Sequence, residues 1–127
     1  MVPPSAPQTR MLPLMHVMHT AGHYKSPPEG ESVSWIEHLR VPALSVGTYS
    51  VPDGGADTQS PHTEDEVYVV TAGTAVLESG GERAEVGPGS VVYVPAHEAH
   101  RFTAITGDFA VLVFFAPAEY SQASTSR

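Results

Sequence analysis

The sequence predicts an all-β domain, built as a sandwich, a jelly roll or a small barrel, and three observations support this fold class. Glycine and proline recur about every eight to twelve residues between positions 26 and 120. The segments between them alternate in polarity or run apolar, and they are rich in Val, Tyr, Phe and Thr. No stretch of this region shows sustained helical periodicity. Several short antiparallel strands need two packed faces or a closed barrel to cover their apolar sides.

Eight strands are expected between the glycines and prolines. In chain order they cover Ser32–Leu39, Ala43–Val51, Glu66–Thr71, Thr74–Ser79, Glu82–Val86, Ser90–Val94, His100–Ile105 and Phe109–Ala116. The Gly80-Gly81 pair supplies the positive φ angles that a tight hairpin requires between the fourth strand and the fifth. The run from Gly87 to Gly89, with proline between, breaks the fifth strand before the sixth begins.

Residues 26–120 form the expected barrel domain. Residues 1–25 are expected to be a disordered arm, because their first ten positions are rich in Pro, Ser, Gln and Thr and bury little surface. Residues 121–127 are expected to be a polar tail of the same kind. The N-terminus lacks the order of a secretory signal, so a cytoplasmic protein is expected.

Charge and composition exclude several classes of function. The chain has 14 acidic residues against 6 Lys and Arg and a formal charge of -8, with no basic cluster, which argues against a nucleic-acid partner. No apolar run approaches the roughly 20 residues that span a bilayer, so no membrane segment is expected. Cysteine is absent, so any metal must be held by nitrogen and oxygen ligands.

Two stretches carry the polar residues of interest, and the first runs from residue 54 to 73. His62 and Glu66 are four positions apart, so in an extended chain they leave the same face as Tyr68 and Val70. Burying an ionised carboxylate on an apolar face costs several kcal/mol unless a cation or good hydrogen bonds compensate the charge. Glu66 therefore needs a partner.

Three partners for Glu66 are compatible with these residues. A metal ion is one, because two imidazoles and one carboxylate form a facial triad, and His100 in the second stretch offers the second imidazole. Hydrogen bonds from one or both histidines are another. In the third case Glu66 faces water together with Glu64 and Asp65.

The two stretches resemble the paired signature of the cupin superfamily. The first motif is matched by Gly54, His62, Glu66 and Gly73, and the second by Gly89, Pro95 and His100. The resemblance covers about residues 40–116. It implies a double-stranded β-helix, or jelly-roll barrel, with a divalent metal at its mouth held by His62, Glu66 and His100.

The departures from the family pattern affect the metal site. The first histidine of the usual pair is Ser60, so water, Ser60 itself or the neighbouring Gln59 would complete the ligand shell. The glycine of the second motif is His97, and its final asparagine is Ala104. His97 and Tyr68, which shares the face of Glu66, are the candidates for proton transfer.

The leading interpretation is a metal-dependent enzyme, most concretely an iron-type dioxygenase that acts on a small apolar or aromatic molecule, because a metal with three protein ligands has positions left for substrate and dioxygen. Mn, Zn or Ni are the other metals considered. The alternatives are a non-redox isomerase, lyase or cyclase with zinc, nickel or no metal, and a binding or sensing module without turnover. This fold hosts many unrelated activities.

A homodimer is expected, because Val67 and Val69 make the outward face of their strand apolar while Val70 points inward. In related folds the first strand supplies an inter-subunit sheet, so Trp35 is expected at an interface.

Overall fold

The structure, a computed structural model, describes residues 14–123, which contain strands and no helix. The predicted all-β class is confirmed. The strands are β1 (Ser34–Val41), β2 (Leu44–Val51), β3 (Asp65–Ser79), β4 (Glu82–Val86), β5 (Val91–Val94) and β6 (His100–Ala116). Within residues 14–123 there is accordingly no helix that could span a membrane. The predictions for residues 1–13 and 124–127 lie outside the described residues.

β3 and β6 each join two of the expected strands into one, and glycine explains the difference. Gly73 in β3 has a φ angle of 72°, and a Cβ there would lie 2.8 Å from the Cα of Phe109. Gly107 in β6 has the same φ angle, and the β3–β6 register shifts around these positions. The two strands therefore bend together, where the sequence pattern indicated a break.

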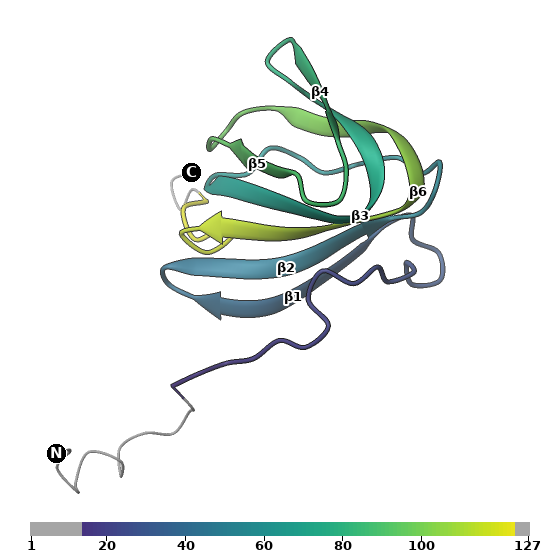
Figure 1. Cartoon of the computed structure of the whole chain (residues 1–127). Helices are drawn as coiled ribbons and strands as arrows, with labels where there is room; N and C mark the ends of the chain where they lie inside the picture. The colour runs from purple at the N-terminus through teal and green to yellow at the C-terminus, as the bar shows by residue number, and fades with distance from the viewer. Residues whose placement is uncertain (1–13, 124–127) are drawn as a thin grey trace, which may run out of the picture.

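All strand pairs are antiparallel, in the order β1-β2-β6-β3-β4, with β5 also paired to β3. The first half of β3 pairs with β5 and the end of β6, and its second half pairs with β4 and the start of β6. The bend thus folds one sheet over itself into two layers (Figure 1). Phe102 from one layer packs edge-to-face on Tyr68 and Phe109 of the other, and this contact lies in the centre of the core.

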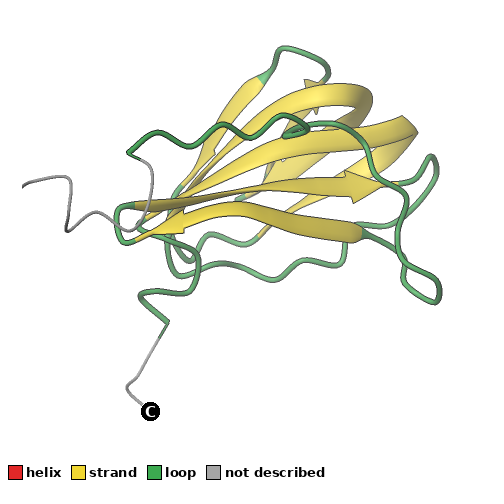
Figure 2. Ribbon diagram, turned by 90° about the horizontal axis from the view of Figure 1, so that it is seen from below, coloured by secondary structure: helices red, strands yellow, loops and turns green. Residues whose placement is uncertain are grey.

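The inner face of β3 carries Glu66, Tyr68 and Val70, all buried, as the two-residue period predicts. The described part of the N-terminal segment crosses the opposite, outer face of the strands (Figure 2). Gly22 anchors it there, since its N–H donates to the Thr48 hydroxyl at 2.7 Å and its carbonyl accepts from Thr71. On this inner face Glu66 lies close to the end of the barrel where β3 begins.

Candidate metal centre

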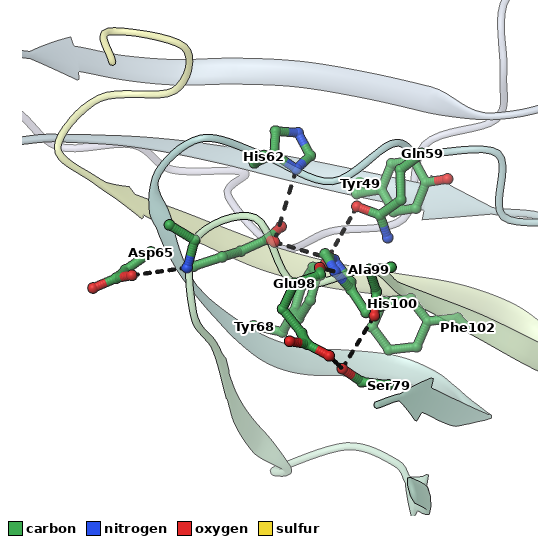
Figure 3. A network of polar contacts seen from close by, with 12 residues as sticks. Tyr49, Gln59, His62, Asp65, Tyr68, Ser79, Glu98, Ala99, His100 and Phe102 are labelled. Carbon is green, nitrogen blue, oxygen red and sulfur yellow. Dashed lines mark hydrogen bonds and ion pairs between the residues drawn. The ribbon is translucent and has the colours of Figure 1, made fainter. Parts of the chain in front are cut away.

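Three residues of the two motifs, His62, Glu66 and His100, lie together at this end of the barrel; Figure 3 shows His62 and His100 within this polar network. Glu66 comes from β3, His62 from the loop before it and His100 from the first position of β6. Their exposed fractions are 2%, 7% and 8%, so all three are buried. Glu66 Oε1 lies 3.2 Å from His100 Nε2 and 3.8 Å from His62 Nδ1. The interpretation in which Glu66 faces water is wrong, and Glu64, which was grouped with it, is buried as well.

Two polar atoms of this cluster have no hydrogen-bond partner, namely His62 Nδ1 and Glu66 Oε2. An unsatisfied buried polar group costs about 1–3 kcal/mol, and more when it is charged. No set of three or more His, Asp or Glu side chains in residues 14–123 is already arranged to hold a metal ion. The three candidate ligands instead contact one another, and the two unpartnered atoms remain available to a cation.

His100 is oriented by its backbone surroundings. Its Nδ1 lies 2.8 Å from the carbonyl oxygen of Glu98, to which it donates, so Nε2 faces Glu66 and the hydroxyl of Tyr68. Burial by itself lowers the pKa of His100, but hydrogen bonds to Glu66 and to the Glu98 carbonyl outweigh it and leave the pKa above its usual value. A proton on Nε2 is thus favoured in the absence of a metal.

Tyr68 connects this cluster to a second buried carboxylate. Its hydroxyl lies 2.8 Å from His100 Nε2 and 2.9 Å from Gln59 Oε1, and the amide nitrogen of Gln59 donates to Asp57 at 2.8 Å. Asp57 also accepts a 2.6 Å bond from the hydroxyl of Tyr49. Burial, and then the nearby charge of Glu66, raises the pKa of Tyr68 well above its usual value, so the phenol stays protonated.

Gln59 lines the cavity beside this cluster, whereas Ser60 and His97 do not. Both of these side chains are exposed. His97 has a φ angle of 69°, a left-handed conformation that explains why the family pattern has glycine at this position. Its backbone N–H donates to the carbonyl of His62 at 2.7 Å, so it is the main chain of His97 that supports the site.

A cavity of about 180 Å³ opens next to His62, Glu66 and Tyr68. Four of its eleven lining residues are Trp, Tyr or Phe and two are carboxylates, with no Lys or Arg among them. An apolar cavity of roughly 150 Å³ is enough to bind benzene. The cavity therefore accommodates one ring with small substituents.

Trp35 forms part of the cavity wall and remains 39% exposed, so its expected place at a subunit interface stays a prediction. Its indole lies over Gly47, where an added Cβ would be 2.3 Å from a ring carbon. The ring also meets Phe115 edge-on, with centroids 6.2 Å apart. The absence of a side chain at Gly47 is what allows the indole to lie against the sheet.

Glu119 is a site residue that the sequence reasoning missed. Its Oε2 lies 3.0 Å from His62 Nε2, its exposed fraction is 9%, and it lines the cavity. The next residue, Tyr120, stacks on the His62 imidazole with ring centroids 5.2 Å apart. No local spacing connects Glu119 with a histidine 57 positions earlier. The available signal was only an acidic residue soon after the last apolar strand.

Comparison with known proteins identifies the family. The sequence pattern of the cupin domain matches residues 47–116, which is more than half of the chain. The chain belongs to the cupin family. This cupin is also 46% identical over 86 residues to the uncharacterised protein SCO3923 of Streptomyces coelicolor, and the match spans 68% of this chain and 82% of the relative.

Solved structures share the fold of this cupin at low sequence identity. KdgF from Halomonas sp. superposes with a TM-score of 0.63 at 23% identity, covering 71% of this chain and 84% of KdgF. Salicylate 1,2-dioxygenase from Pseudoaminobacter salicylatoxidans, in its adducts with gentisate, gives a TM-score of 0.63 at 15% identity. That match covers 72% of this chain but 27% of the dioxygenase. Both likenesses establish the fold and the jelly-roll class.

Proposed function

We propose that this cupin is a metal-dependent enzyme, an iron-type dioxygenase, acting on a small molecule with a single apolar or aromatic ring. One observation carries the proposal. Two buried atoms that can ligate a metal, His62 Nδ1 and Glu66 Oε2, have no hydrogen-bond partner and lie beside a cavity of the size of one substituted ring. A dioxygenase of the same fold provides a precedent, because its structure holds gentisate.

The donor set fits a divalent cation. His62, Glu66 and His100 would hold it, and two imidazoles with one carboxylate suit Fe²⁺, with Mn²⁺, Zn²⁺ and Ni²⁺ as the other metals of similar preference. Glu66 and Glu119 bring negative charge to a cavity with no Lys or Arg among its lining residues, so a cation would compensate an otherwise costly burial. When bound, the metal supplies a Lewis acid with open positions for substrate and dioxygen.

The protein's own side chains would bind and orient the substrate. Trp35 and Phe115 present aromatic surfaces that select a flat apolar ring and exclude water. Tyr68, whose raised pKa keeps its hydroxyl protonated, would donate a hydrogen bond or a proton to a developing oxyanion. His97 has no part in this proposal, because its side chain is exposed and outside the cavity lining.

Elemental analysis of the untagged protein tests the metal assignment. We expect about one transition metal ion per chain in the wild type and a loss of most of it in His62→Ala and in Glu66→Gln. Glu85→Gln is a matched control, because Glu85 is exposed on β4 and the substitution makes the same chemical change as Glu66→Gln. Equal metal content in all four proteins would reject the metal site.

Oxygen uptake tests the reaction class. Iron-loaded wild type should consume dioxygen with an uncharged single-ring phenol such as catechol, and Glu66→Gln should not. The Tyr68 hydroxyl, 2.8 Å from His100 Nε2, specifically favours one competing function, a non-redox enzyme that moves protons. Incorporation of solvent deuterium into the ligand without oxygen uptake would favour that function instead.

A further inference from the structure

We infer that Glu119 is a positioning residue for the metal site, holding the His62 imidazole in the tautomer and orientation that present Nδ1 to the cation. The inference rests on the proposed function for what Nδ1 binds. Its geometric part concerns only residues of this chain, and it can be tested without any metal.

The tautomer follows from the contact between the two side chains. An ionised carboxylate only accepts hydrogen bonds, so the 3.0 Å contact between Glu119 Oε2 and His62 Nε2 requires the proton to be on Nε2. His62 Nδ1 is buried without a hydrogen-bond partner. A neutral imidazole protonated on Nε2 leaves a lone pair on Nδ1, and a lone pair is what a metal ion needs from a histidine.

Two aromatic rings pack against the imidazole and restrict its orientation. Phe115 lies with its ring centroid 4.5 Å from that of His62, and Tyr120 stacks at 5.2 Å with an interplanar angle of 26°. Rotation of the imidazole by half a turn about its Cβ–Cγ bond would put Cε1 in the place of Nε2 and Cδ2 in the place of Nδ1, and would break the bond to Glu119. With the imidazole held by these contacts, Nδ1 lies 3.8 Å from Glu66 Oε1.

The chain around Glu119 is held in place from several directions. Its N–H donates to Ser45 Oγ at 2.8 Å, and its carbonyl accepts from Arg40 at 2.9 Å. Glu64, which is 1% exposed, accepts bonds from the N–H groups of Tyr120 and Gln122 at 2.6 and 2.9 Å. The buried carboxylate of Glu64 and the guanidinium of Arg40 thus both hold the turn that carries Glu119. A positioning residue requires this kind of support.

Carboxylates that fix metal-binding histidines in this way typically change metal affinity 10- to 100-fold when they are mutated. We therefore compare Glu119→Gln, which keeps an acceptor oxygen but loses the charge, with Glu119→Leu, which loses both. The probe is Mn²⁺ or Co²⁺ alone, titrated calorimetrically into metal-free protein. We expect about 10-fold weaker binding for Gln and about 100-fold for Leu, with Glu85→Gln and Glu85→Leu unchanged.

The tautomer is read separately, from the imidazole nitrogen NMR spectrum of the metal-free protein. In the wild type His62 should be protonated on Nε2, Glu119→Gln should retain this state, and Glu119→Leu should give a mixture of tautomers. A role limited to stability would not move this signal. Glu119→Gln is nearly isosteric with the wild type, so it remains a folded comparison if the Leu variant fails to fold.

Either of two results overturns the inference: a proton on Nδ1 of His62 in the wild type, or unchanged metal affinity and tautomer in Glu119→Leu. A wild type that binds neither Mn²⁺ nor Co²⁺ would count against the proposed function. The NMR measurement would still decide whether Glu119 positions His62.

Discussion

At the scale of single residues, His100 has two competing partners for one nitrogen. Its Nε2 lies within reach of Glu66 and Tyr68, and the hydrogen bond to Glu66 raises its pKa against the opposing effect of burial. A histidine whose pKa is raised by folding stabilises the metal-free protein fully below its unfolded pKa, and that contribution is lost as the pH rises through the folded value. Binding of a cation to the same nitrogen has the opposite pH dependence, because that nitrogen must first lose its proton.

Metal binding should therefore release a proton and weaken as the pH falls below the raised pKa of His100. Calorimetric titration of Mn²⁺ in two buffers that differ in ionisation enthalpy measures this release, because the apparent enthalpies then differ between buffers. Repeating the titration from pH 8 down to about pH 6 should show a progressive loss of affinity as His⁺ forms. Identical enthalpies and a constant affinity would contradict the assignment of His100 as a ligand.

The individual site residues also show how much of the site could be predicted from the sequence. His62, Glu66 and His100 were identifiable because each lies at a fixed spacing from a turn or within one strand, where alternation sets the direction. Ser60 was misleading, since alternation counted back from Glu66 places it inside. Ser60 and Pro61 are both exposed, and this shift in alternation before His62 brings Gln59 to the cavity.

At the scale of elements, the sequence predicted the bounds of most strands closely. It did not predict that β3 and β6 are each one continuous strand. The bounds of β4, Glu82–Val86, agree with the expected ones, because glycine turns define both of its ends. β3 and β6 run through Gly73 and Gly107, where a local pattern cannot distinguish a bend from a break. The turn that carries Glu119 escaped prediction because its contacts lie 57 residues away for His62 and 74 for Ser45.

The C-terminal turn should depend on Glu64. Glu64→Ala removes the acceptor of the Tyr120 and Gln122 amides, and we expect a loss of about 1–3 kcal/mol in the free energy of unfolding. Hydrogen exchange of residues 119–122 should accelerate by more than that of the β2 amides, since the change is local. Glu85→Ala is the exposed control. Unchanged exchange in the turn would show that the Glu64 contacts do not hold it.

At the scale of the whole molecule, an apolar patch lies on the outer face of β5 and the first half of β3. Val91 and Tyr93 of β5 are 67% and 60% exposed, and in register beside them stand Val69 and Val67 of β3. Contiguous exposed apolar surface of this kind is typical of an interaction site. We propose that a second copy of this chain covers it.

Light scattering during size exclusion should give a mass near twice the 13.5 kDa of one chain. The double substitution Val91→Glu and Tyr93→Glu should yield monomers, because four carboxylates would then oppose one another across a two-fold interface. Glu85→Lys, on the other layer, should leave the mass unchanged. A wild type that is monomeric at millimolar concentration would reject this dimer.

The segment that matches the cupin sequence pattern, residues 47–116, ends on both sides short of two cavity residues. Trp35 precedes it and Glu119 follows it, yet both line the same space as Glu66. Substitutions in the two flanks can therefore change which molecule the cavity accepts while the residues that would hold the metal stay the same. Chimeras that exchange only these flanks between relatives should transfer ligand preference and leave the metal where it was.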